Sequence, residues 1–249
     1  MIFAAGVGSR LRPITDTIPK ALVEVGGEPM LSRTLKRMSA VGIMDVVVNV
    51  HHHAEKIVEY LAANNNFGMN ISISDESDEL LDTGGGLLKA MPLIGDADAV
   101  VLHNADIYTD IPLRPLIEAF ERSSADTVLA VNHRDTSRYL LVDSGCMMRG
   151  WTNVTTGEVR PASLTPEMLR TLDKSGFCGI HVVNPKTLAP ELQRYADAVG
   201  QKFSLTPFYI ECVDHLDIIC QHIPTSSSWI DIGKPASLAQ ARTLASTQS

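Results

Sequence analysis

Short apolar runs and helical repeats alternate along the first half of the chain. Asp45–Val50 is rich in β-branched residues and predicts a buried strand, and Pro29 opens a stretch in which Leu31, Leu35 and Met38 have helical spacing. The same alternation predicts strands at 2–5, 71–74, 99–102 and 127–131 and helices at 55–61, 86–91 and 112–120. Strands and helices in this order form a mostly parallel sheet with helices on both faces.

The pattern changes after residue 135. Three short apolar pieces separated by turns, at 139–142, 147–151 and 157–160, predict antiparallel strands that add a small lobe to the sheet. Regular structure then returns as strands at 179–183 and 218–222 and helices at 188–196, 206–213 and from Pro235 onward. We therefore expect one domain over residues 1–249, with a Rossmann-like, doubly wound α/β fold and a small antiparallel lobe.

Composition narrows the classes of protein that this chain can be. Hydrophobic residues make up 45% and charged residues 20% of 249 residues, which is ordinary for a globular fold. A net charge of -8 disfavours a nucleic-acid partner, because binding a phosphate backbone needs a basic face. There is no apolar run of about 20 residues and no signal pattern, so we expect no membrane partner. Four cysteines without a C-x-x-C pair favour buried, reduced thiols in a cytoplasmic protein.

The strongest local feature is F-A-A-G-V-G-S-R-L-R-P at residues 3–13, followed by P-K at 19–20. Gly6 and Gly8 let backbone N–H groups approach phosphate oxygens, and Arg10 and Lys20 supply positive charge. The third glycine of the dinucleotide fingerprint and the G-K-[ST] of a P-loop are both missing. The alternative for the two glycines is a tight turn between strand and helix.

Two carboxylates also stand out. Asp106 follows the predicted strand 99–102, at the carboxyl edge where open α/β sheets bind ligands, and is well placed to meet a divalent ion. Asp231 alternates with the apolar Ile230 and Ile232, so its charge faces the other side and needs a partner. A loop cap for Asp106 and a salt bridge for Asp231 are the alternatives.

Histidines and serines give no competing site. The consecutive His51, His52 and His53 point in alternating directions on an extended chain and do not converge on one ion, so we expect them to end a strand. The chain also has no G-x-S-x-G elbow of a hydrolase.

The stretch A-A-G-x-G-S-R-L-x-P with its following P-K resembles the opening motif of the nucleotidylyltransferases that make NDP-sugars. The resemblance implies that Arg10 and Lys20 contact a triphosphate and act in catalysis with Asp106. The family's N-G-D motif matches 104–106, with alanine at the middle position, and its W-x-D-x-G motif matches 229–233. In that family these aspartates, here Asp106 and Asp231, together hold Mg²⁺.

The resemblance extends along most of the chain. D-T-G-G-G at 82–86 matches a segment beside the base and sugar, most of all in N-acetylmuramate 1-phosphate uridylyltransferases, and 176–180 matches a G-x-x-G-I strand that lines the sugar pocket. Helix opening and core packing are the alternatives for these two segments. Arg138 and Lys174 are candidates to hold the sugar phosphate, with an exposed charge as the alternative for each.

The implied sites form two sets. The nucleotide-binding set is Ala4, Ala5, Gly6, Gly8, Ser9, Arg10, Lys20, Gly84, Gly85 and Asn104. The sugar-phosphate-binding set is Asp82, Arg138, Phe177 and Gly179. The first set falls in a nucleotide-binding part at about 1–135, and most of the second in a sugar-phosphate-binding part at about 136–249.

The resemblance implies Mg²⁺-dependent transfer of a nucleotidyl group from an NTP to a sugar 1-phosphate, with release of pyrophosphate. UTP with N-acetylmuramate 1-phosphate is favoured by the D-T-G-G-G segment. A guanylyltransferase acting on mannose or heptose 1-phosphate and a catalytically silent nucleotide-sugar-binding module are the alternatives. Relatives begin a few residues earlier, so we expect a short or incomplete first strand; the oligomeric state, a homodimer included, is left open by the sequence.

Overall fold

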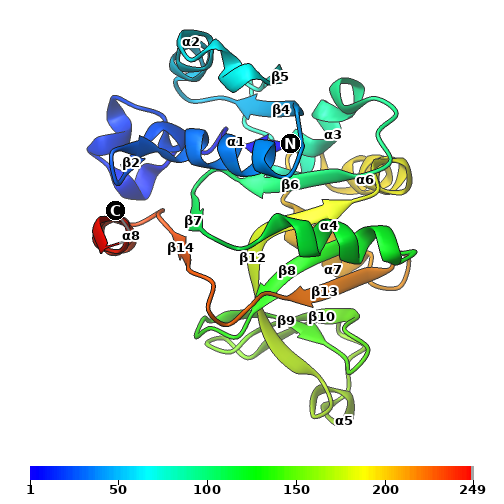
Figure 1. The fold of residues 1–249 in the computed structure, drawn as a ribbon. Helices are drawn as coiled ribbons and strands as arrows, with labels where there is room; N and C mark the ends of the chain where they lie inside the picture. Colours follow the sequence, from blue (N-terminus) through cyan, green and yellow to red (C-terminus); the bar gives the residue numbers. More distant parts are fainter. Residues whose placement is uncertain (248–249) are drawn as a thin grey trace.

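The computed structural model describes residues 1–247, and a mixed sheet of ten strands runs through its centre (Figure 1). The main strands lie in the spatial order β5 (Asn70–Asp75), β4 (Asp45–Val50), β1 (Ile2–Phe3), β6 (Val100–Asn104), β12 (Asp173–Val183), β8 (Thr127–Asn132) and β13 (Ile218–His222). Neighbours from β5 to β6 are parallel, β12 is antiparallel to β6 and β8, and β13 is parallel to β8. The predicted doubly wound, mostly parallel α/β fold is confirmed.

Helices cover both faces of this sheet. One face packs against α3 (Asp82–Ile94), α6 (Pro185–Val199) and α7 (Leu205–Glu211), and the other against α1 (Met30–Ala40), α2 (Ala54–Ala63) and α4 (Leu113–Arg122). The neighbours Ile2 and Phe3 belong to different cores, because successive side chains of a strand point to opposite faces. Every helix that the periodicity predicts is present, and α3 begins four residues before the predicted Gly86 because D-T-G-G-G forms its first turn.

The small lobe is also present, as the lower part of Figure 1 shows. It consists of β9 (Arg138–Val142), β10 (Met148–Asn153), β11 (Glu158–Arg160) and the short helix α5 (Pro166–Leu169). β12 joins the lobe to the main sheet, since its first residues pair with β9 and its last with β6. The strand predicted at 179–183 is therefore only the end of an eleven-residue strand, which is irregular opposite β8 around Gly179, where φ is +70°.

A two-stranded ribbon lies beside the main sheet. β7 (Ile107–Thr109) pairs antiparallel with β14 (Trp229–Asp231), and Asp231 lies opposite Ile107. The ribbon packs through Tyr108 and Ile230 against a third core that includes α8 (Pro235–Thr247). Because Asp106 directly precedes Ile107, this pairing brings it close to an aspartate more than a hundred residues away. The sequence pattern did not predict β7, which is three residues long.

Short elements complete the described part of the chain. They are the 3-10 helices η1 (Ser9–Leu11), η2 (Ile14–Asp16), η3 (Lys20–Leu22) and η4 (Asn65–Gly68) and the strand pair β2 (Glu24–Val25) and β3 (Glu28–Pro29). Between residues 1 and 247, no helix has the length and apolar character that crossing a membrane requires.

The cysteines agree with the sequence analysis at three of four positions. Cys178, Cys212 and Cys220 are buried free thiols, and burial raises their pKa values to about 12, 11 and 12. Cys146 is exposed, so the expectation of a buried thiol there is wrong. It lies in the turn between β9 and β10, with φ of +64°, and a turn between antiparallel strands leaves its side chain in solvent.

Candidate active site

The chain turns sharply after β1, at the glycine-containing segment. Gly8 has φ of +67°, and a Cβ there would lie 2.8 Å from Thr15 Cγ2, so both the backbone conformation and the contact require glycine. The Thr15 hydroxyl donates a hydrogen bond of 2.8 Å to the Gly8 carbonyl, which holds the turn against η2. Gly6 has open space where a side chain would be. The turn therefore presents exposed backbone at Gly6, while Ala4 and Ala5 before it are buried.

Five predicted site residues, Asp106 among them, line one small cavity beside this turn. Its volume is about 150 Å³, and its lining is Phe3, Ala4, Gly6, Lys20, Ala21, Thr83, Asn104, Ala105 and Asp106. Ala4, Gly6, Lys20 and Asn104 come from the predicted nucleotide-binding set. Ser9 lies on η1 and is exposed outside this lining. The cavity is closed by the end of β6 and by the first turn of α3, at the carboxyl edge of the parallel strands.

Two carboxylates converge on one buried cation. Lys20 is 8% exposed, and its Nζ donates a hydrogen bond to Asp106 Oδ2 and lies 3.7 Å from Asp231 Oδ1. Since a hydrogen bond spans at most about 3.2 Å, those two carboxylate oxygens are no more than about 7 Å apart. The side chains of Asp106 and Asp231 remain 25% and 42% exposed, so both also face solvent or a ligand.

The charged side chains lie close together because Gly233 has no side chain between them. A Cβ on Gly233 would lie 2.8 Å from Arg10 Nη2, 2.8 Å from Asp231 Oδ1 and 2.9 Å from Lys20 Nζ. The Gly233 N–H also donates a hydrogen bond of 2.8 Å to Asp231 Oδ1. The sequence analysis gave Gly233 no role of its own, although it ends the W-x-D-x-G motif. A side chain at this position would displace the charged ends of Arg10, Lys20 and Asp231.

The two carboxylates fit a hard divalent ion. Oxygen ligands are those that Mg²⁺ prefers, and Mg²⁺ in enzymes is held by one or two carboxylates together with phosphate oxygens and water. The cation that both carboxylates face here, Lys20 Nζ, shows that they converge on a single positive charge. Within residues 1–247 no three His, Cys, Asp or Glu side chains are grouped to hold a metal.

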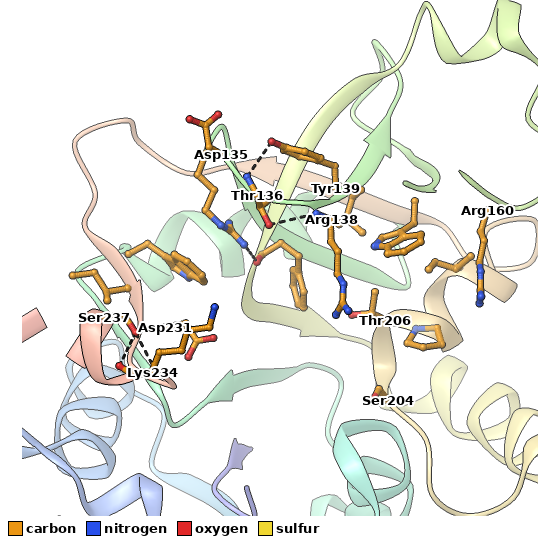
Figure 2. Close-up of a pocket in the computed structure, with 18 of the residues that line it drawn as sticks. Asp135, Thr136, Arg138, Tyr139, Arg160, Ser204, Thr206, Asp231, Lys234 and Ser237 are labelled. Carbon is orange, nitrogen blue, oxygen red and sulfur yellow. Dashed lines mark hydrogen bonds between the residues drawn. The ribbon is translucent and has the colours of Figure 1, made fainter. Parts of the chain in front are cut away.

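A larger cavity, of about 800 Å³, opens on the other side of Asp231 (Figure 2). Its walls come from the antiparallel lobe, the start of α7, β14 and the start of α8. Arg138 and Phe177 of the predicted sugar-phosphate set line it, as does Asp231. Asp106 lines the small cavity and Asp231 the large one, so the carboxylate pair lies between the two cavities.

The sequence analysis missed three cations of the large cavity, namely Arg134, Arg160 and Lys234. Arg134 stacks over the Trp229 ring at 3.9 Å and donates a hydrogen bond of 2.8 Å to the Phe177 carbonyl. Burial lowers its pKa from the usual arginine value. Arg134 therefore fixes β12 against β14 and holds one wall of the cavity. The position of this basic residue just after a predicted strand is the sequence signal that could have identified Arg134 as a site residue.

Several predicted site residues lie outside both cavities. Gly84 and Gly85 donate backbone hydrogen bonds of 2.8 and 3.1 Å to the Phe203 carbonyl, and a Cβ on Gly84 would collide with the Phe203 ring. These glycines open α3, as the alternative for this segment expected, and they pack against residues 201–203 with their N–H groups occupied. Asp82 opens α3 with φ of +59° and lines neither cavity. Lys174 is exposed on β12 outside the large cavity, so the predicted phosphate contact finds no support there.

Gly179 lies between the two sites and not in the wall of either. A Cβ on Gly179 would lie 2.8 Å from Asn104 Nδ2, so the missing side chain lets the Asn104 amide pack against β12. Its predicted contact with the sugar phosphate stays a prediction. The direct effect of Gly179 is on the position of Asn104, which lines the small cavity.

A buried chain of hydrogen bonds supports the glycine turn from behind. The Ala4 N–H donates to Asn49 Oδ1 at 2.7 Å, and Asn49 Nδ2 donates to Glu76 Oε1 at 2.7 Å. The Leu81 N–H donates to Glu76 Oε2 at 3.0 Å, and Glu76 is fully buried. This chain connects the start of the glycine turn with the loop before α3, whose Thr83 lines the small cavity. The sequence analysis did not single out either Asn49 or Glu76.

The three histidines follow the end of β4, as expected. His51 Nδ1 is 2.7 Å from the Glu76 carbonyl, His52 Nε2 is 3.3 Å from the Thr15 carbonyl, and His53 Nε2 is 3.1 Å from the Asp16 carbonyl. Each ring therefore meets a different backbone oxygen. His52 and His53 together hold η2, the segment against which the glycine turn packs.

A glycine turn after the first strand, with clustered charges at the carboxyl edge of a doubly wound sheet, defines an α/β protein that binds phosphorylated ligands. The chain belongs to the nucleotidyl transferase family, whose profile matches residues 1–248, and it is a nucleotidyltransferase.

Two proteins with similar sequences and one solved structure with a similar fold show what this chain resembles. The chain is 30% identical over 257 residues to the N-acetylmuramate alpha-1-phosphate uridylyltransferase of Neisseria meningitidis serogroup B, which covers 98% of this chain and 97% of that protein. It is 33% identical over 141 residues to the mannose-1-phosphate guanyltransferase of Yarrowia lipolytica, which covers 56% of this chain and 39% of that protein. A crystal structure of UDP-glucose pyrophosphorylase with UDP-glucose has the same fold, with a TM-score of 0.79 at 14% identity over 100% of this chain and 98% of that one.

Proposed function

We propose that this nucleotidyltransferase transfers a nucleotidyl group from an NTP to a sugar 1-phosphate and releases pyrophosphate, with UTP and N-acetylmuramate 1-phosphate as its substrates and Mg²⁺ as its cofactor. The observation that carries the proposal is the position of Asp106 and Asp231. Their carboxylates converge on Lys20, beside Arg10, and lie between the small cavity, which Asp106 lines, and the large one, which Asp231 lines. Part of a nucleotide at the small cavity, which is too small for a whole NTP, and a sugar phosphate in the large one would meet at this point.

The proposed reaction requires neutralisation of negative phosphate charge more than it requires proton transfer. An oxygen of the sugar phosphate forms a bond with the α-phosphorus of the NTP, the bond from that phosphorus to the β-phosphate oxygen breaks, and pyrophosphate leaves with its electron pair. The second pKa of a phosphate monoester is about 6, so the sugar phosphate is mostly a dianion at neutral pH. The nucleophile therefore needs no general base. The obstacle is repulsion between two anions, together with charge that builds up on the leaving group.

The residues around Asp106 and Asp231 would reduce this repulsion and stabilise the charge on the leaving group. Arg10 and Lys20 bring two cations to the phosphates, and the exposed backbone at Gly6 adds N–H donors. Asp106 and Asp231 would hold Mg²⁺, which neutralises phosphate charge and orients the phosphates when bound. Positioning of the two substrates at one place supplies a further part of the rate.

The identification with N-acetylmuramate 1-phosphate draws on the uridylyltransferase that aligns over nearly the whole chain at 30% identity. Pyrophosphate release is to be measured with Mg²⁺ and each of UTP, GTP, CTP and dTTP, paired with N-acetylmuramate, mannose and heptose 1-phosphates. The expected result is release with UTP and N-acetylmuramate 1-phosphate at a rate well above every other pair. The Asp106→Asn variant is the control for release by contaminating enzymes. A protein that binds UTP but releases no pyrophosphate with any sugar phosphate would be a silent binding module.

Guanylyl transfer to mannose 1-phosphate is the second candidate. It is favoured by the 33% identity to a mannose-1-phosphate guanyltransferase over 56% of the chain. Thermal unfolding with each NTP and Mg²⁺ separates the two candidates, since a nucleotide that binds only the folded protein raises its midpoint. A larger rise with UTP than with GTP is expected, and the reverse order would favour the guanylyl donor.

A further inference from the structure

The large cavity contains two cations whose charged ends have no partner within residues 1–247. The guanidinium of Arg138 and the ammonium of Lys234 form no hydrogen bond or ion pair in this part of the chain, where only the backbone N–H of each residue donates to a neighbour. The other two cations of the lining are occupied. Arg134 is held by a backbone carbonyl, and Arg160 pairs with Glu158 at 2.6 Å.

These two free cations stand at different places in the cavity. Lys234 follows β14 and is three residues from Asp231, at the end where the proposed function puts the reacting phosphate. Arg138 begins β9 on the antiparallel lobe, and Figure 2 shows its side chain extending into the cavity beside Thr206, apart from Asp231 and Lys234. The carboxylate of Asp135 is directed away from Arg138 in the same view. Arg138 is therefore free to meet an anion of the ligand.

The size of the cavity allows one ligand to reach both places. A volume of about 800 Å³ lies within the ordinary range for sites that bind small molecules, and a sugar phosphate occupies only part of it. A planar guanidinium presents paired N–H donors that match the two oxygens of a carboxylate. A ligand with a phosphate at one end and a carboxylate at the other would neutralise both cations.

We infer that Arg138 binds a carboxylate carried by the sugar, so that the enzyme selects an acidic sugar 1-phosphate over a neutral one. This inference rests on the proposed function, because it takes the reacting phosphate to lie at Asp231. It changes the role that the sequence predicts for Arg138, from holding the phosphate to recognising a second anionic group. N-acetylmuramate has this chemistry, since it is N-acetylglucosamine that carries a lactyl ether with a carboxylate.

The test compares two substrates that differ in that carboxylate. Arg138→Met removes the guanidinium and its charge and keeps an unbranched apolar stem, and kcat/KM is measured with UTP, Mg²⁺ and either N-acetylmuramate or N-acetylglucosamine 1-phosphate. The expected loss is about ten- to hundred-fold for the acidic sugar, mainly in KM, which is the scale of a hydrogen bond to a charged group. Less than about three-fold change is expected for the neutral sugar.

Two controls separate recognition from general effects. Lys174→Met removes an exposed cation outside the cavity and is expected to leave both substrates unchanged. Arg138→Lys keeps the charge without the paired donors and is expected to lose less than Arg138→Met with the acidic sugar. Arg138 is exposed and its guanidinium has no partner in the described chain, so both variants should unfold at the wild-type temperature.

Each other outcome overturns the inference in a recognisable way. Equal losses with both sugars would put the phosphate at Arg138, and no loss with either would leave Arg138 without a role in recognition. A wild-type enzyme that prefers the neutral sugar phosphate would contradict the inference and leave nucleotidyl transfer intact. Absence of pyrophosphate release with every sugar phosphate would contradict the proposed function itself, and the inference with it.

Discussion

Replacement of Glu76 by glutamine tests the buried hydrogen-bond chain behind the glycine turn. Both partners of the Glu76 side chain are N–H donors, Asn49 Nδ2 at 2.7 Å and the Leu81 amide at 3.0 Å. A carboxylate accepts from both, but a glutamine amide has one accepting oxygen and one NH₂ group. In either orientation, Glu76→Gln leaves two donors facing each other at a fully buried position. We expect unfolding to require about 1–3 kcal/mol less than in the wild type.

A second substitution should restore the chain. In Asn49→Asp/Glu76→Gln, the new carboxylate at position 49 accepts from the Ala4 N–H and from the new amide, while the oxygen of that amide accepts from Leu81. The double variant keeps one negative charge in the chain, as the wild type does, whereas Asn49→Asp alone brings two carboxylates together. We therefore expect the double variant to be more stable than either single variant.

Urea unfolding of the four proteins measures this coupling directly. The chain links the start of the glycine turn to the loop before Thr83, so KM for the NTP should rise in Glu76→Gln and fall back in the double variant, with KM for the sugar phosphate nearly constant. Wild-type stability of Glu76→Gln, or a double variant whose loss is the sum of the single losses, would refute this account of Glu76.

Three further predictions concern catalysis, the turn and pH. Asp106→Asn should keep the wild-type circular dichroism spectrum and lower turnover at least ~100-fold in the pyrophosphate assay, and a near wild-type rate would remove Asp106 from the site. Gly8→Ala should cost about 1–3 kcal/mol in urea unfolding because φ is +67° and Thr15 Cγ2 is 2.8 Å away, whereas Gly6→Ala, with open space, should cost less than half as much. Burial lowers the pKa values of His103 and His181 to about 3, so below pH 6.5 the unfolded chain binds more protons than the folded protein. The free energy of unfolding should therefore be highest above pH 6.5 and fall by up to about 2.7 kcal/mol per pH unit toward pH 4. A flat profile of this free energy from pH 7 to 5 would contradict the prediction.

The sequence predicted the fold where local pattern and tertiary packing agree. Asp45–Val50 forms a strand over the predicted residues because a segment with four valines suits a strand that is buried on both faces. The pattern missed β7 and the first half of β12. These segments are strands because of the partners they meet, β14 and β9, and no local periodicity records such pairing.

The site was predictable where a short motif fixes backbone geometry. The glycine turn, Lys20 and the two aspartates come together through segments whose local sequence is distinctive. Gly84 and Gly85 let α3 pack closely against the segment around Phe203, more than a hundred residues away. The local sequence does not show this contact, so the two glycines were predicted to bind the ligand instead. The sequence singled out Arg138 but not Arg134, and only the contacts show that Arg134 is held in the wall of the large cavity and that Arg138 is free.

Asp106 and Asp231 are proposed to hold one divalent ion between them. Binding of Mn²⁺, measured by electron paramagnetic resonance in the presence of UTP, tests it in the wild type, Asp106→Asn, Asp231→Asn and the double variant. We expect one tightly bound ion in the wild type and weaker binding in each single variant. The double variant should lose less affinity than the sum of the two single losses, because both residues bind the same ion. Wild-type Mn²⁺ affinity in either single variant, or losses that add in full, would contradict a shared ion.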